Sequence, residues 1–150
     1  MKEEYNKLKK KYDLPDFSEL NENFNLEEIE QEKFLLKSIS RRMCEKIGVF
    51  SNLMEEELHP EGKLSTLHES SQLEDEDKKT ILKIYRQLIF REREFLSLEI
   101  NYEEEKYALF VKELFIEWNS LKPPIKDLLE KIKTFWSHDK KIKLELSYFG

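Results

Sequence analysis

The amino-acid sequence predicts an all-α protein: an antiparallel helical bundle of three long helices and a shorter fourth, with short N-terminal helical turns and an extended C-terminal tail. Its 150 residues include 3 Gly and 4 Pro, whereas 39% are charged and 39% are hydrophobic, a composition typical of amphipathic helices. Ten Phe, six Tyr and two Trp indicate a packed interior, because each aromatic ring can bury roughly 150–250 Å². We expect one domain over residues 1–150, with an arm (1–24), a bundle (25–137) and a tail (138–150).

The N-terminal arm is predicted to contain two short helices. Residues 2–12 are good helix formers whose apolar side chains recur three and four positions apart. Pro15 should end this helix, because a proline disfavours the helical conformation in the residue before it. Asp16 can then cap a second short helix over residues 17–24, whose apolar side should pack against the bundle.

The first long helix is predicted over residues 25–58. Asn25 would cap it, and the glutamates that follow suit the positive end of the helix dipole. Pro60 and Gly62 interrupt the helical pattern. Residues 63–72 are polar apart from two leucines, so we expect them to form the main interhelical loop.

Two further long helices and a short one follow this loop. An aspartate should open a helix over residues 75–100, and Asn101 can open another over residues 102–121 as part of a capping box. Two consecutive prolines should end that helix. The second of them, Pro124, suits the first position of a final helix over residues 124–137.

The C-terminal tail has a strand-like alternation of apolar and polar residues. A single strand leaves its backbone groups unpaired, so the tail either packs on the bundle, pairs elsewhere or is disordered. It could add a strand to the sheet edge of a partner protein. The candidate partner-binding residues are Ile142, Leu144, Leu146, Tyr148 and Phe149.

Charge is distributed unevenly along the chain, whose formal net charge is −6. Residues 1–11 carry five Lys against two Glu, and residues 122–143 carry seven Lys against three acids, whereas the part between them is strongly acidic. A polyanion such as RNA would therefore bind the two ends rather than the body. The candidate polyanion-binding residues are Lys9, Lys10, Lys11, Lys133, Lys140, Lys141 and Lys143.

No motif predicts an enzyme, a cofactor site or a small-molecule substrate. Glu56 and His59 have the Glu-x-x-His spacing of di-iron bundles, but such a site needs a second pair and further carboxylates. His68 lies among serines, yet this segment shows no sign of a strained nucleophile turn. Cys44 falls within a predicted helix, where a thiol usually behaves as a small buried hydrophobic group.

One acidic residue falls on an apolar seam. Glu92 lies four residues after Leu88 and three before Phe95, at a position that normally carries an apolar side chain. Arg41 and Arg42 are candidates to neutralise it in a buried pair. Alternatively, Glu92 lies at the edge of the seam and its long side chain reaches solvent.

Two segments resemble those of small all-helical archaeal proteins of unassigned function. They are residues 11–17 (KYDLPDF) and residues 75–79 (DEDKK), each of which leads into a predicted helix. The resemblance implies a cytoplasmic archaeal protein and no chemistry. A cytoplasmic location also fits the single cysteine and the absence of a secretory pattern, and no run of roughly 18 apolar residues predicts a membrane span.

These observations favour a noncatalytic protein-binding or scaffold protein, whose partner is another protein or a second copy of this chain. The alternative is an RNA- or ribosome-associated factor that binds through its basic termini. A metal-dependent helical-bundle enzyme is a third hypothesis, and the sequence supports it least.

Overall fold

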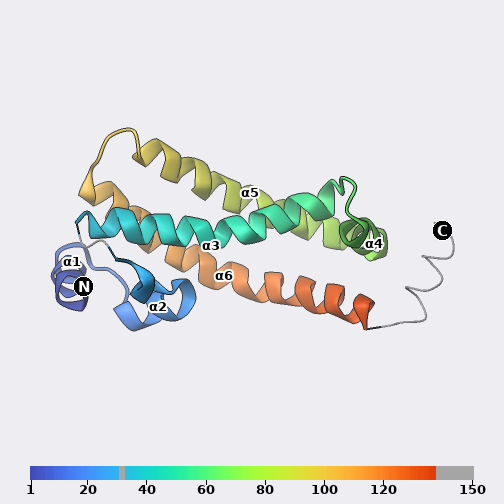
Figure 1. Cartoon of the computed structure of the whole chain (residues 1–150), viewed down its shortest axis with the longest axis horizontal. Coiled ribbons are helices and arrows are strands. Elements are labelled where there is room, and N and C mark those ends of the chain that lie inside the picture. Colours follow the sequence, from blue (N-terminus) through green and yellow to red (C-terminus); the bar gives the residue numbers. More distant parts are fainter. Residues whose placement is uncertain (31–32, 138–150) are drawn as a thin grey trace. The chain divides into compact units, whose positions relative to one another are not determined.

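The computed structural model describes residues 1–30 and 33–137, and all regular secondary structure in these ranges is helical (Figure 1). The helices are α1 (Lys2–Tyr12), α2 (Phe17–Phe24), α3 (Leu35–Leu58), α4 (Leu64–Gln72), α5 (Asp75–Leu98) and α6 (Glu104–Trp136), with a 3-10 helix, η1 (Leu26–Glu28), between α2 and α3. The predicted all-α class is confirmed, and so are the two short N-terminal helices. None of the described helices combines the length and the apolar character that crossing a membrane requires.

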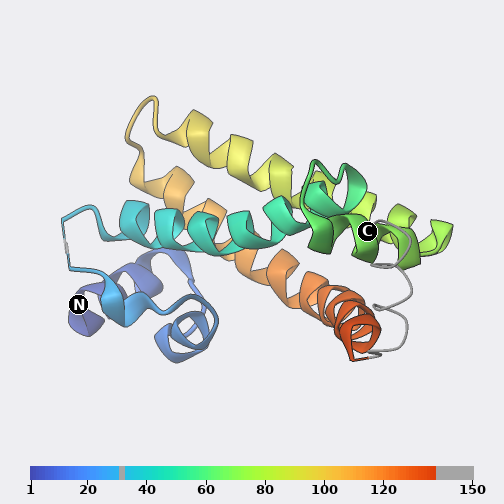
Figure 2. The ribbon, with the colours of Figure 1, turned by 45° about the vertical axis from the view of Figure 1, so that its right-hand side comes forward.

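The helices pack into two compact units. Unit 1 consists of Met1–Phe50 and Gln87–Ser120, and unit 2 consists of Ser51–Arg86 and Leu121–Gly150. In unit 1, segments of α3, α5 and α6 lie side by side, and in both units α5 runs antiparallel to the other two (Figures 1 and 2). The predicted antiparallel arrangement of long helices is therefore present within each unit.

The core of unit 1 is rich in aromatic side chains. Trp118 of α6 is 3% exposed and packs against Phe24 of α2 and Phe50 of α3, with ring centroids 6.1 and 5.3 Å apart. Phe95 of α5 is also buried. Through Phe24, the short helix α2 is tied to the long helices, because rings of this size bury much more area than aliphatic side chains.

Unit 2 has an apolar core that is accompanied by buried polar groups. Ile81 and Ile84 of α5 and Leu128 of α6 are at most 4% exposed. The predicted aspartate at the start of α5 is confirmed, because the N–H of Glu74 donates a hydrogen bond of 3.2 Å to Asp77 Oδ2. The buried polar residues of this unit are Ser51, Glu57, Thr66, His68 and Ser70.

The first long helix begins at Leu35, and the predicted start at Asn25 is wrong. Asn25 ends α2 in the left-handed conformation, with φ of 53°. Asparagine tolerates this region because its short polar side chain can form local hydrogen bonds. Leu26 then lies in η1 with its side chain fully buried, so tertiary packing favours a tight turn where the helical pattern would have continued.

Helix α4 occupies the segment predicted to be the main loop. Gly62 turns the chain before it, with φ of 73° in the left-handed region that favours glycine. Within α4 the usual pattern is reversed: Thr66 and His68 are buried, while Leu64 and Leu67 are 51% and 42% exposed. Because sequence-based helix prediction depends on a buried apolar stripe, a helix that buries its polar side is missed.

Helix α6 begins at Glu104 and continues through Pro123 and Pro124, so the predicted break at these prolines is wrong. A proline inside a helix removes one hydrogen bond and costs about 3 kcal/mol. Here the carbonyl groups that lose a donor lie four residues earlier, in an exposed part of the helix that water can reach. Leu121 and Ile125 lie one turn apart, on the same side, and are buried, which stabilises the helix across the prolines.

Candidate functional site

Arg91 lies at the centre of an ionic cluster in unit 1. Its side chain is 11% exposed and forms ion pairs of 3.0 Å with Glu94, 3.0 Å with Glu113 and 3.3 Å with Glu117. Arg91 and Glu94 belong to α5, whereas Glu113 and Glu117 belong to α6, so the cluster joins the two helices. We call these four residues the Arg91 cluster.

Three exposed apolar side chains flank the Arg91 cluster. Phe90 is 60% exposed, and its ring centroid lies 5.5 Å from the central carbon of the Arg91 guanidinium group. Leu109 and Ile116 are 54% and 69% exposed. They lie four residues before and three residues after Glu113, which places all three on one side of α6. We call the Arg91 cluster and these three apolar residues the α5–α6 face.

The α5–α6 face carries a surplus of negative charge. One arginine meets three glutamates, so two carboxylates of the cluster are not compensated by it. Burial lowers the pKa of Arg91, but hydrogen bonds and charge from the three carboxylates outweigh this effect and raise it. The guanidinium group therefore stays charged.

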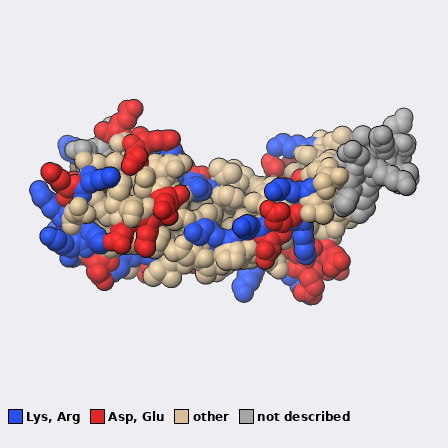
Figure 3. Space-filling view, turned by 90° about the horizontal axis from the view of Figure 1, so that it is seen from below, with Lys and Arg blue, Asp and Glu red and all other residues tan. Residues whose placement is uncertain are grey.

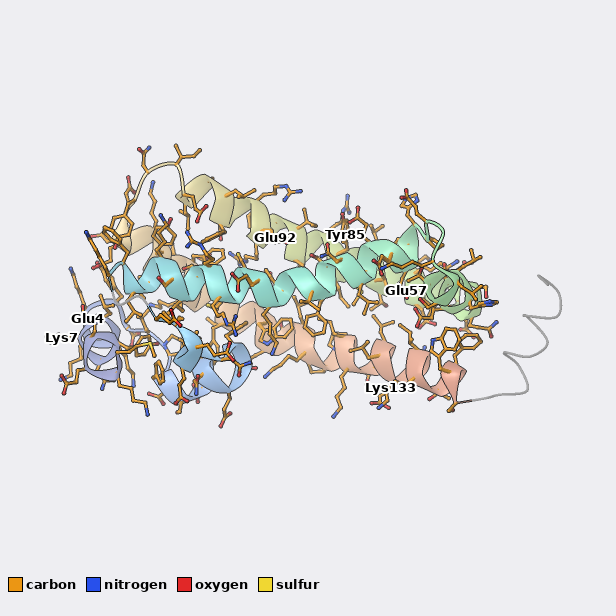
Figure 4. All side chains as sticks on the ribbon, viewed as in Figure 1. Glu4, Lys7, Glu57, Tyr85, Glu92 and Lys133 are labelled. Carbon is orange, nitrogen blue, oxygen red and sulfur yellow. The ribbon has the colours of Figure 1, made fainter. Side chains whose placement is uncertain are left out.

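Two glutamates of unit 2, the buried Glu57 and the partly exposed Glu69, form the second candidate site. Glu57, near the end of α3 (Figure 4), is 1% exposed, whereas Glu69 on α4 is partly exposed. Glu69 also accepts a hydrogen bond of 2.7 Å from the indole N–H of Trp136 on α6. No N–H or hydroxyl group of the described residues donates to either oxygen of Glu57. We call Glu57 and Glu69 the carboxyl pair.

The surroundings of the carboxyl pair favour a neutral Glu57. Burial is the main cause, and the neighbouring Glu69 adds to it, so that the pKa of Glu57 is raised to about 9. The buried imidazole ring of His68 packs edge-on against the indole ring of Trp136, with 6.3 Å between the ring centroids. A carboxyl group that stays neutral at pH 7 can donate a hydrogen bond as well as accept one.

Two clefts open on unit 2. The larger has a volume of about 580 Å³ and is lined in part by Glu56, His59 and Lys63. Glu56 pairs with Lys63 at 2.9 Å. The smaller has a volume of about 370 Å³ and includes Glu69 in its wall. Across residues 1–30 and 33–137, no three His, Cys, Asp or Glu side chains are arranged to hold a metal ion, so the Glu56–His59 spacing gains no further ligand there.

The N-terminal lysines predicted to bind a polyanion are mostly engaged by acidic groups. Lys9 forms an ion pair with Asp16, and Lys11 forms one of 3.5 Å with Glu104. Lys10 is exposed. On the face drawn in Figure 3, Lys and Arg side chains are interspersed with Asp and Glu side chains. This mixture is unlike the continuous basic surface that nucleic-acid binding usually requires.

The remaining predicted binding residues lie at the C-terminal end. Lys133 of α6 pairs with Glu130 at 3.3 Å. The other predicted residues fall outside the described ranges; they are Lys140, Lys141, Ile142, Lys143, Leu144, Leu146, Tyr148 and Phe149.

Glu92 lies on α5 close to α3 (Figure 4), but the predicted arginine partners bind elsewhere. Arg41 pairs with Glu99 at 3.0 Å, and Arg42 donates a hydrogen bond of 3.3 Å to the backbone carbonyl oxygen at the end of α2. Oε1 of Glu92 lies 3.3 Å from the position that a Cβ on Gly48 would take. The missing side chain of Gly48 therefore leaves room for this carboxylate.

Sequence reasoning did not single out the central residues of either site. Arg91 falls, like Glu92, on the predicted apolar seam of α5, and Glu57 continues the seam of α3 three residues after Met54. A charged residue at an otherwise apolar seam position is the sequence signal that could have identified both Arg91 and Glu57. Glu69 carries no such signal, because its segment was predicted to be a loop.

Comparison with known proteins identifies no family for this chain. No family model, curated protein or solved structure matches it. The described residues form a small all-helical protein. Because no relative indicates a function, the function has to be inferred from the two sites described above.

Proposed function

We propose that this chain is a noncatalytic protein-binding protein that engages a basic amphipathic helix through the α5–α6 face. The observation that carries the proposal is the exposure of Phe90, Leu109 and Ile116 around a cluster with two uncompensated carboxylates. Apolar side chains gathered on an exposed surface commonly mark an interaction site. We also propose a cytoplasmic location and an archaeal origin, which the resemblance of residues 11–17 and 75–79 to small archaeal proteins supports.

The spacing of the exposed side chains suits a helical partner. Leu109 and Ile116 are seven residues apart on α6, so they lie about 10 Å from each other along the helix axis. An amphipathic helix presents its own apolar anchors at this interval. Lysine or arginine side chains beside those anchors would compensate the surplus carboxylates of the Arg91 cluster.

The two other hypotheses from the sequence have weaker support. RNA binding relies on basic termini, yet Lys9 and Lys11 are engaged by acidic side chains. A metal-dependent enzyme needs a set of ligands, and the Glu56–His59 spacing gains none among the described residues. The C-terminal tail remains a predicted second contact for a protein partner.

A synthetic amphipathic peptide of Leu and Lys is the probe that tests the proposal. Its binding to the full chain is measured by fluorescence anisotropy at low and high salt, beside a peptide in which every Lys is replaced by Glu. We expect the Lys peptide to bind and the Glu peptide not to bind. The affinity for the Lys peptide should fall as the salt concentration rises, because salt screens exposed charges.

Paired substitutions then locate the binding surface. The variant carrying Leu109→Ser and Ile116→Ser should bind the Lys peptide at least tenfold more weakly, a loss of about 1.4 kcal/mol. Leu96→Ser is the matched control, because Leu96 is also 54% exposed but lies on a different side of α5 from Arg91. Circular dichroism establishes that all variants are folded.

Three outcomes would contradict the proposal. In the first, the double variant binds as tightly as the original chain. In the second, Leu96→Ser weakens binding as much as the double variant does. In the third, the original chain self-associates in sedimentation experiments and the double variant does not, which would make a second copy the occupant of the α5–α6 face.

A further inference from the structure

We propose that Glu113 determines which helices the α5–α6 face accepts, because it leaves Arg91 and pairs with a lysine or arginine of the partner helix. The inference rests on the proposed function, since it concerns the same face. It goes beyond that function by naming the residue that recognises the partner's charge and the sequence pattern that the partner must carry.

Glu113 is the most exposed carboxylate of the Arg91 cluster. Its side chain is 44% exposed, compared with 29% for Glu94 and 20% for Glu117. A carboxylate that already meets water loses less solvation on being paired than a shielded one does, provided that the partner leaves part of it in water. Pairing with a basic side chain of a bound helix therefore requires less desolvation at Glu113 than at the other two acids.

Arg91 holds Glu113 through a single hydrogen bond. This bond of 3.0 Å comes from Nη1, which also donates a bond of 3.0 Å to Glu94. Glu117, by contrast, accepts two bonds of 3.3 Å, one from Nε and one from Nη2. Such a two-bond pairing fixes the orientation of the guanidinium group. Arg91 therefore keeps its position and its compensation by Glu94 and Glu117 when Glu113 turns towards a partner.

Glu113 lies next to two exposed apolar side chains of α6. Leu109 precedes it by four residues and Ile116 follows it by three, so the three side chains share one side of the helix. A partner helix lying along this side contacts all three. Its contacting side must therefore carry a lysine or arginine that has apolar residues three or four positions away in both directions.

The lysines of α6 near Glu113 do not take the place of a partner's charge. Lys112 lies about 100° around the helix from Glu113, because successive residues of a helix are separated by this angle. Lys106 pairs with Glu103 at 2.8 Å. Within residues 1–30 and 33–137, Arg91 is the cation that pairs with Glu113. Glu113 is thus available to an external cation once it leaves Arg91.

A double-mutant cycle between the full chain and the Lys peptide tests the role of Glu113. The peptide is made as a series in which one Lys at a time is replaced by Gln, and each affinity is measured by fluorescence anisotropy at low salt. At one Lys position the replacement should weaken binding to the original chain about threefold to fivefold, as for an exposed ion pair. The same replacement should have almost no effect on binding to Glu113→Gln, because the carboxylate that it would pair with is already absent.

Glu94→Gln and Glu117→Gln are the matched controls, since each removes one carboxylate from the same cluster. In both controls the replacement of that Lys should weaken binding as much as it does in the original chain. Circular dichroism establishes that the variants are folded. The peptide series on the original chain does not depend on any variant.

Two outcomes would overturn the role of Glu113 and leave the proposed function intact. In one, the Lys peptide binds and the Leu109→Ser, Ile116→Ser variant weakens binding, but every Lys replacement has the same effect in Glu113→Gln as in the original chain. In the other, the effect of a Lys replacement disappears in Glu94→Gln or Glu117→Gln instead. A Lys peptide that does not bind the original chain would refute the proposed function, and this inference with it.

Discussion

Replacing Arg91 by methionine should destabilise unit 1 by leaving three glutamates without their shared counter-charge. Methionine keeps much of the apolar contact with Phe90 but cannot pair with Glu94, Glu113 or Glu117. Removing one partner from a fully buried ion pair costs about 3–5 kcal/mol. The three glutamates are 20% to 44% exposed, so water screens part of this effect. We expect a loss of about 2–3 kcal/mol in the free energy of unfolding.

Urea denaturation at low and high salt is the assay. The loss should be larger at low salt, where the repulsion among the glutamates is less screened. Arg93→Met is the matched control, since Arg93 is exposed on the same helix, and it should change stability by no more than about 0.5 kcal/mol. Adding Glu113→Gln should destabilise the original chain but restore stability to Arg91→Met.

Two results would refute the reasoning about the Arg91 cluster. One is a loss in Arg91→Met that is no larger than the loss in Arg93→Met. The other is an effect of Glu113→Gln on the free energy of unfolding that has the same sign in the original chain and in Arg91→Met. A shared counter-charge requires this sign to reverse.

Three further predictions concern other parts of the chain. Burial, aided by the carboxylate of Glu92, raises the pKa of Cys44 to about 12. Cys44 of the native protein should therefore resist alkylation at pH 8, whereas Cys44 of the urea-unfolded protein should react. Rapid labelling of the native protein would contradict this prediction. Gly48→Ala should not give the increase of about 1 kcal/mol in folding stability that this substitution usually gives in a helix, because the new Cβ would lie 3.3 Å from Oε1 of Glu92. Combining Gly48→Ala with Glu92→Ala should restore that increase, which thermal melting would measure. Deleting residues 140–150 should reduce capture of a protein partner from lysate and leave the far-ultraviolet circular dichroism spectrum unchanged. Undiminished capture would exclude the C-terminal tail as a contact for that partner.

The correct predictions from the sequence came from segments in which local pattern and burial agree. Residues 2–12 and 17–24 form the expected short helices, and the helix expected over residues 75–100 is α5 (Asp75–Leu98). In these segments the side chains that recur three and four positions apart are the ones that the fold buries. Their identity as helices could therefore be read without knowledge of their neighbours.

The incorrect predictions came from positions where a neighbour overrides the local signal. Asn25 suits a helix start, but burial of Leu26 places it at the end of α2. Two prolines signal a helix end, but burial of Leu121 and Ile125 carries α6 past them. Helix α4 was missed because it buries polar side chains such as Thr66 and His68. Its hydrogen bond to α6, from Trp136 to Glu69, joins residues distant in the sequence.

The sequence by itself determined the helical class, the amphipathic seams and the uneven distribution of charge, because these properties depend on residue type and local spacing. Tertiary structure alone decided the functional candidates. Arg91 pairs with glutamates up to 26 positions away, and Glu69 of α4 accepts a hydrogen bond from Trp136 of α6, which is 67 positions away. The physical reason is that ion pairs and hydrogen bonds between helices depend on distance and burial, and the periodicity of one helix carries no information about either quantity.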